Sequence, residues 1–202
     1  MKKLKIAIIS LSICACIGSA IAVEKINSSI QVINTSADHL IYSNADDLSN
    51  YADLVIIGTP TKEFSEYEPY INLNSAGRID DYCTFVEIKP IKILKGNVNG
   101  DIIKASQRAA LIDNGSILSG KELLKNEEVQ LLEKDRKYLL FLKDIGNGQY
   151  SIVSLNQGVF KLDNLPITDK LAKIASNDSL KANNQYNDLR NLVLEKYKKD
   201  IN

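Results

Sequence analysis

Short runs of apolar residues, several of them with a period of two, indicate a chain built mainly from β-strands. The run at 54–57, LVII, is too short for a buried helix and rich in β-branched residues, so we predict a strand covered on both faces. Gly146-Asn147-Gly148 predicts a tight hairpin turn after another strongly apolar run. The predicted strands cover residues 54–57, 85–95, 101–107, 138–142, 149–154 and 158–162.

The second of these strands changes its parity once. Its apolar residues shift from Val86 and Ile88 to Ile91 and Ile93 on either side of Pro90. Proline has no N–H for a ladder, and a bulge inserts one residue and so moves the following side chains to the other face. We therefore predict a bulge at Pro90, with Ile91 and Ile93 buried. A strand bent in this way is typical of a small barrel, where one strand serves two sides.

Three segments show helical signals. "KELLKNEEVQLLEK" (121–134) overlaps a capping-box spacing at Ser119 and Glu122 and is rich in helix formers, so we predict a helical insert there. The same spacing at Ser43 and Asp46 predicts a short helix. Near the C-terminus, apolar residues at spacings of three and four predict an amphipathic helix. They are Ala182, Tyr186, Leu189, Val193 and Tyr197.

The order of these elements is strand, bulged strand, strand, helix, strand and strand, which is the order of an OB-fold, a five-stranded Greek-key barrel. The predicted fold is mainly β with helices: an OB-like five- to six-stranded barrel with a helical insert before strand 4 and a C-terminal amphipathic helix. The chain divides into a signal peptide (1–22), a leader (23–42), the barrel domain (43–165) and C-terminal helices that pack on the barrel (166–202).

The first residues read as a targeting segment. Lysines at positions 2, 3 and 5 precede an uncharged apolar stretch, and an A-x-A cleavage site ends at Ala22. We expect a mature chain that starts at Val23 and is secreted or attached to the outer face of the cytoplasmic membrane. Two alternatives stay open for the N-terminus. In the first, Cys16 becomes a lipid-bearing first residue. In the second, the run 6–23 remains as an uncleaved membrane anchor. We expect membrane contact only in these two ways.

Charge and cysteine content narrow the class of partner. Cleavage removes three lysines and leaves 22 basic and 25 acidic residues, a net charge of −3. This mild acidity argues against nucleic acid, whose binders present a dense basic face to phosphates. Only Cys83 remains in the cleaved chain, so the core must hold without an intrachain disulfide, and we expect this cysteine to be a small buried residue.

No catalytic or metal-binding pattern stands out. His39 is the only histidine, and its unpatterned surroundings predict a solvated or capping role. The acidic pairs at 46–47, 80–81 and 127–128 consist of adjacent residues, whose side chains point apart on a strand or helix. There is no phosphate loop, dinucleotide fingerprint or calcium loop. We therefore predict no catalytic residue, no metal and no cofactor.

Three segments resemble, in order, the netrin-like domains related to tissue inhibitors of metalloproteinases, including exported bacterial members. They are "ADLVIIG" (52–58), "KILKG" (92–96) and "KYLLFL" (137–142). The resemblance covers about residues 46–162 and implies an OB-like barrel in an extracytoplasmic protein. In the inhibitors, a Cys-x-Cys pair begins the mature chain and presents an amino group to a protease zinc. Here Cys14 and Cys16 lie inside the targeting segment, so this activity is not carried over.

The segment 62–82 is the candidate partner-binding region, because it holds four aromatic residues and a net charge of −3. Aromatic rings supply contact area at low entropy cost, and carboxylates favour a cationic partner. The candidate residues are Tyr67, Tyr70, Tyr82, Glu66 and Asp81. The alternative is that the tyrosines extend the core under a long hairpin. The binding hypothesis requires at least two open tyrosine rings beside Glu66 or Asp81.

The sequence thus predicts an exported, non-catalytic binding or interaction module whose partner is a protein, a peptide or a cationic ligand. One alternative is a protease-inhibitor-like protein, which rests on the resemblance alone. The other is an envelope enzyme that uses carboxylates on the mouth of the barrel.

Overall fold

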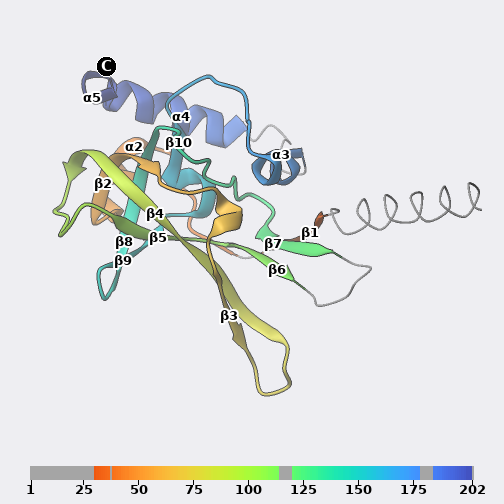
Figure 1. Ribbon diagram of the computed structural model, residues 1–202. Coiled ribbons are helices and arrows are strands. Elements are labelled where there is room, and N and C mark those ends of the chain that lie inside the picture. The colour runs from red at the N-terminus through yellow and green to blue at the C-terminus, as the bar shows by residue number, and fades with distance from the viewer. Residues whose placement is uncertain (1–29, 37, 114–119, 178–183, 202) are drawn as a thin grey trace, which may run out of the picture.

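The computed structural model describes residues 30–36, 38–113, 120–177 and 184–201. The predicted signal peptide and Cys16 lie outside this part of the chain. Within it, the fold is mainly β with helices, as predicted (Figure 1).

Five strands form a closed ring in the order β2-β4-β5-β9-β8. All neighbours in the ring are antiparallel except β5 and β9, and the pairing of β8 with β9 closes the circle. A sixth strand, β10 (Val159–Lys161), pairs with the start of β8. The ring strands are β2 (Leu54–Pro60), β4 (Ile79–Lys95), β5 (Ile103–Gln107), β8 (Tyr138–Gly146) and β9 (Gln149–Ile152).

Strand β2 is buried on both faces, as the run LVII predicts. Leu54 and Ile56 join a hydrophobic cluster inside the ring, the inner cluster, together with apolar side chains of β4, β5 and β8. Val55 and Ile57 join a second cluster, the outer cluster, on the opposite face of the sheet. The ring therefore separates two cores, and β2 contributes to both.

The predicted bulge in β4 is confirmed. Gly58 pairs with Pro90 and Ile57 pairs with Lys92, so Ile91 is the extra residue, and a second register shift follows within two residues. The prediction that Ile91 and Ile93 are buried is wrong, because they are 54% and 46% exposed. Beyond Ile88, β5 no longer pairs with β4, so this half of β4 lies at the edge of the ring with one face uncovered.

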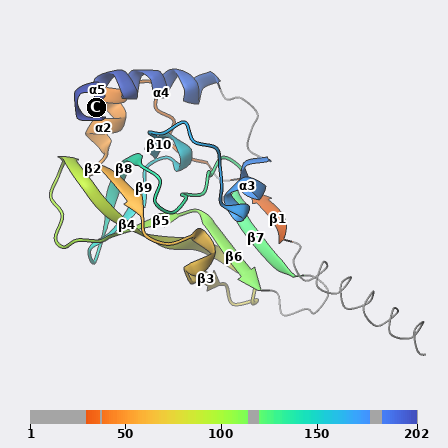
Figure 2. The same cartoon turned by 45° about the horizontal axis from the view of Figure 1, so that its top comes forward.

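The prediction of a helical insert is wrong. A second sheet takes its place. It has three strands in the order β1-β7-β6, with β1 parallel to β7 (Figure 2). Leu123 and Leu124, adjacent in β7, are both buried, in different clusters on its two faces. A strand can bury two adjacent residues in this way, and such tertiary packing overrides helix propensity. The strands are β1 (Ile30–Thr35), β6 (Ala109–Asp113) and β7 (Lys121–Asn126).

Strand β1 lies within the segment that the sequence analysis assigned to a leader. Its alternation is weak, since only partly buried apolar side chains such as Ile30 and Val32 reach the core. Its partner β7 supplies the backbone hydrogen bonds that make the segment a strand.

Four helices cover the sheets within the described residues. Helix α4 presents the predicted apolar face, on which Leu189 and Val193 are buried in the outer cluster. Tyr197, directly after the end of α4, is buried in the same cluster, while Ala182 lies outside the described part. The predicted capping box at Ser43 is wrong: Asn44 is the N-cap of α2, and its side chain accepts from Asp47 N at 2.8 Å. The helices are α2 (Ala45–Tyr51), α3 (Lys170–Asn177), α4 (Asn184–Lys196) and α5 (Lys198–Ile201).

A matched pair of substitutions on β4 tests this burial pattern. Ile88→Ala should lower the free energy of unfolding by about 2–5 kcal/mol, because Ile88 is fully buried in the inner cluster. Ile93→Ala should lower it by about 0.5 kcal/mol or less, since Ile93 is half exposed. Urea unfolding of both variants measures the difference. Equal losses would show that the second half of β4 is buried after all.

Candidate functional site

The segment 62–82 is a hairpin arm that projects from the ring (Figure 1). Strand β3 (Pro69–Leu73) pairs with the first part of β4, after the single-turn 3-10 helix η1 (Phe64–Glu66). The turn at the tip is formed by Asn74-Ser75-Ala76-Gly77, which are typical turn residues. Asn74 Oδ1 accepts from the N–H groups of Ala76 and Arg78 at 3.0 and 3.1 Å, and Gly77 takes a positive φ of 73°.

Tyr82 and Asp81 fix the arm to the second sheet. Ile71 and Tyr82 are paired on the inner face of the arm, where Tyr82 is buried and hydrogen-bonds through its hydroxyl to Thr35 of β1. The Arg108 guanidinium lies 5.4 Å from the centre of the Tyr82 ring and forms an ion pair with Asp81. These two candidate residues therefore have structural partners on β1 and beside β6.

Tyr67 and Glu66 stabilise the base of the arm. The Tyr67 hydroxyl donates to Glu87 O at 3.3 Å and accepts from Lys62 N at 3.1 Å, and its half-buried ring contacts the inner cluster. Glu66 Oε2 accepts from Glu63 N at 2.7 Å, across the start of the 3-10 turn.

The structure does not bring the five candidate residues together. Tyr70 is the one open ring among the three tyrosines, at 52% exposed, and lies on the outer face opposite Cys83. The requirement for two open rings is not met. Instead, the arm exposes two residues that the sequence analysis missed, Leu73 and Ile79, which pair across the strands next to the tip. Their positions on either side of the turn residues 74–77 were the available signal in the sequence.

The rim of the arm is acidic. Glu68 and Asp80 are exposed, and within the described ranges neither carboxylate forms an ion pair. Arg78 supplies one positive charge at the tip. The exposed apolar side chains of the arm are thus surrounded mainly by negative charge.

A groove of about 320 Å³ runs between the base of the arm and β6. One wall comes from the arm and the other from the second sheet, and Glu68 and Asp113 lie on opposite walls. The lining residues are Ser65, Tyr67, Glu68, Pro69, Leu111, Ile112, Asp113 and Lys121.

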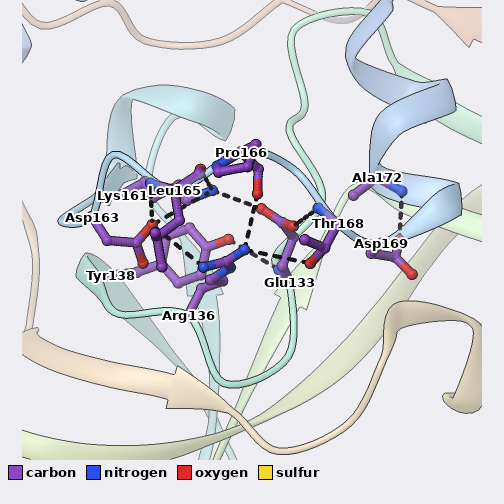
Figure 3. A network of polar contacts seen from close by, with 10 residues as sticks. All are labelled: Glu133, Arg136, Tyr138, Lys161, Asp163, Leu165, Pro166, Thr168, Asp169 and Ala172. Carbon is purple, nitrogen blue, oxygen red and sulfur yellow. Dashed lines mark hydrogen bonds and ion pairs between the residues drawn. The ribbon is translucent and has the colours of Figure 1, made fainter.

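A polar network centred on Glu133 lies at another place in the fold (Figure 3). The Glu133 side chain is only 5% exposed, and its two oxygens accept from Lys161 Nζ at 2.9 Å and from Thr168 N at 3.0 Å. Glu133 N donates to the hydroxyl of Tyr138 at 3.0 Å, and burial raises the pKa of this tyrosine well above its usual range. The network ties the loop before β8 to β10 and to the chain that leads into α3 (Figure 3).

A cavity of about 100 Å³ adjoins this network beneath α3, with Glu133, Tyr138 and Lys161 among its lining residues. Ligand pockets typically measure roughly 300–1,000 Å³. Glu133 is also the single carboxylate in the lining, and both of its oxygens already accept hydrogen bonds. The cavity therefore belongs to a structural joint and has the geometry of neither a substrate pocket nor a carboxylate pair.

Removing Glu133 should be strongly destabilising. Glu133→Ala leaves the Lys161 ammonium partly buried without its main partner, and we expect a loss of about 3–5 kcal/mol in the free energy of unfolding. Glu195→Ala is the control, because it removes an exposed carboxylate 3.3 Å from Lys198 and should change stability by about 0–1 kcal/mol. Chemical denaturation of both variants compares them. Similar losses of unfolding free energy in the two variants would contradict the conclusion that buried Glu133 holds these segments together.

Glu63 and Asp169 form a carboxyl pair that joins η1 to the start of α3. Burial, and then the neighbouring Asp169 carboxylate, raise the pKa of Glu63 above its ordinary value of 4.5, against the weaker opposing effect of Lys134. Glu63 Oε2 is buried and has no hydrogen-bond partner among the described residues. A proton on Glu63 would let this carboxyl donate to Asp169, whose Oδ1 also accepts from Ala172 N at 2.6 Å.

This pair predicts a stability that falls with pH. Because the folded-state pKa of Glu63 is raised, the folded chain binds the proton more tightly than the unfolded chain, and this contribution is lost as pH rises from about 4.5 through the raised pKa. In Glu63→Gln the amide donates to Asp169 at every pH. We expect the variant to gain about 1 kcal/mol at pH 8 and to lose this part of the pH dependence.

Thermal or urea unfolding of the native chain and of Glu63→Gln between pH 4 and pH 8 measures the effect. Glu68→Gln is the matched control, since it removes an exposed carboxylate from the same segment. If Glu63→Gln and Glu68→Gln showed the same pH profile, the carboxyl pair would have no part in stability.

The other reactive side chains have structural contacts. His39 lies 3.3 Å from Glu128, and burial raises the pKa of the Cys83 thiol. Lys95 Nζ donates to Ser49 O and Ala52 O at 2.7 and 2.6 Å, at the end of α2. The part of the chain that the structure describes contains no cluster of three histidine, cysteine, aspartate or glutamate side chains that could hold a metal ion.

No family model matches the chain, and no curated protein matches its sequence significantly. None of the helices in the described ranges has the length and apolar character needed to cross a membrane.

Proposed function

We propose that the chain is an exported, non-catalytic binding module built on an OB-like barrel. The ring order and the bulged second strand support this architecture. The three segments that resemble netrin-like domains fall on β2, on the end of β4 and on β8, and β2 pairs with both of the others. OB barrels bind ligands on the face of strands 2 and 3 and in the loops beside it. The arm occupies the connection between the first two ring strands.

The observation that carries the proposal is the exposure of apolar side chains on a projecting, acidic arm. Tyr70, Leu73 and Ile79 are 52%, 56% and 42% exposed, with Glu68 and Asp80 beside them. Leu73 and Ile79 are paired across the two strands on one face and Tyr70 lies on the other, and exposed apolar side chains on a projecting element are typical of an interaction site. The charge selects the class of partner, which is a protein or peptide with basic residues around an apolar centre.

Export supports a partner in the cell envelope or outside the cell. The charged start, the apolar stretch and the cleavage site at Ala22 carry this part of the proposal. Membrane attachment would come only through an uncleaved N-terminus or a lipid on Cys16.

A carboxylate enzyme is the second candidate, because Glu68 and Asp113 face one groove from opposite walls. Glu68 is exposed, however, whereas a general acid that works near neutral pH is held protonated by burial. The protease-inhibitor-like alternative retains only the resemblance of the three strand segments. Binding is therefore the function that the geometry supports best.

A peptide titration tests the proposal. We expect a peptide with a block of lysines followed by a block of valines to shift the amide signals of Tyr70, Leu73 and Asp80 in NMR spectra. The same peptide with glutamates in place of lysines should not do so. The double substitution Glu68→Gln with Asp80→Asn should weaken binding about fivefold at low salt, because it removes two attractive charges.

The control is Asp188→Asn with Glu195→Gln, which removes two exposed carboxylates from α4 and should leave the affinity unchanged. Signal changes confined to other elements, or equal binding of the lysine and glutamate peptides, would refute the arm as the binding surface.

A further inference from the structure

Within the described residues, strands β10 and β3 are the outer strands of the larger sheet, and each has one edge that pairs with no other strand. Only the edge of β10 is covered by another of the described elements. Strand β10 pairs only with β8, but side chains of α4 bond its outward carbonyls. The Tyr186 hydroxyl donates to Val159 O at 2.9 Å, and Arg190 donates to Lys161 O at 3.1 Å. The edge of β10 is thus closed by a helix.

The edge of β3 is left open. Asn74 N donates to Arg78 O at 2.9 Å, so Asn74 faces β4. The register shift between Asn72 and Leu73 places its extra residue on β4, so alternation along β3 continues and turns the N–H and C=O groups of Ile71 and Leu73 away from β4. Across the described ranges, no hydrogen bond to these groups is formed. Pro69 fits the same alternation, because its missing N–H falls on the open side.

The sequence of β3, PYINL, also lacks the charges that commonly protect an edge strand. Its inner face continues outward from the buried Tyr82 cluster through Ile71 to the exposed Leu73 and Ile79. Two free backbone donors, two matching acceptors and an apolar face are therefore presented together, which is what strand addition requires.

Charge decides which segment fits this edge. A second copy of the chain would bring together two arms that each carry a net charge of −3, and like charges repel. A segment with basic residues would instead pair with them.

We propose that the free edge of β3 is a strand-addition site for an extended segment of another protein in which apolar and basic residues alternate. The apolar residues pack beside Leu73 and Ile79, and the basic residues lie on the face of Tyr70, near Glu68. This inference rests on the proposed function and adds the mode of recognition to it.

Two peptides of one composition separate the two proposals. In one, lysine and valine alternate; in the other, they form two blocks. Strand addition predicts that the alternating peptide binds about tenfold more tightly, through the backbone donors of Ile71 and Leu73. Hydrogen exchange at these two amides should slow in the complex with the alternating peptide and not with the block peptide.

Leu73→Pro and Leu73→Ala form the matched pair of variants. Both remove the leucine side chain, but only proline removes the outward N–H, so Leu73→Pro should abolish the preference for the alternating peptide while Leu73→Ala keeps it. N-methylation of alternate residues in the peptide removes its donors without any change to the protein. It should have the same effect as Leu73→Pro, which covers the case that the proline variant fails to fold.

Each possible outcome of these experiments supports or overturns one of the proposals. Equal affinity for the two peptides, both on the arm, would overturn strand addition and leave the binding function standing. Binding of neither peptide would overturn both proposals. A dimer in sedimentation that Leu73→Pro dissolves in the absence of peptide would show that a second copy occupies the edge, and would overturn the assignment to another protein.

Discussion

The burial of β2 on both faces is the constraint on which the rest of the structure depends. Leu54 and Ile56 need a core inside the ring, while Val55 and Ile57 need one outside it. The inner core requires the ring to close, which the parallel pair β5–β9 and the hairpin β8–β9 achieve. The outer core requires a helical layer, and Tyr197 of the C-terminal region provides it by packing edge-on against Phe141 of β8. A hydrogen bond of 2.9 Å between Tyr197 and Ser49 links this layer to α2.

Those parts of the fold that follow from local physics could be predicted from the sequence. A short β-branched run such as LVII has few alternatives to a buried strand, and Pro90 can sit in a ladder only where a bulge or an edge accepts it. Residues 121–126 could not be assigned correctly, because their helix propensity is good and only the partners β1 and β6 make them a strand. The prediction that Ile93 is buried is wrong for a related reason. The change of parity at Pro90 is correct, but burial depends on which element covers that face of β4, and β5 ends too early to cover it.

The candidate site shows the same limit at the level of single side chains. Composition identified the segment 62–82, and the structure does form a projecting arm there. Composition could not say that Tyr70 and Tyr82 lie on opposite faces, since this depends on their pairing with Cys83 and Ile71. It also gave no weight to Leu73 and Ile79, whose exposure follows from the length of the arm beyond the second sheet. The three tyrosines were predicted to bind a partner, although two of them, Tyr67 and Tyr82, hold the arm in place.

The chain uses most of its charged and hydrogen-bonding side chains to join elements that are distant in sequence. Glu133 connects three segments, Lys95 caps α2, and Arg190 closes the edge of β10. A group engaged in this way is poorly placed for chemistry, because a proton or a ligand would have to displace a buried partner. The arm is different, since the outward N–H groups of Ile71 and Leu73 and the carboxylates of Glu68 and Asp80 have no partners within the described part of the chain. Exposed groups of this kind are hydrated, and a second molecule can replace that water with its own hydrogen bonds and charges, which is why we propose the arm as the recognition surface.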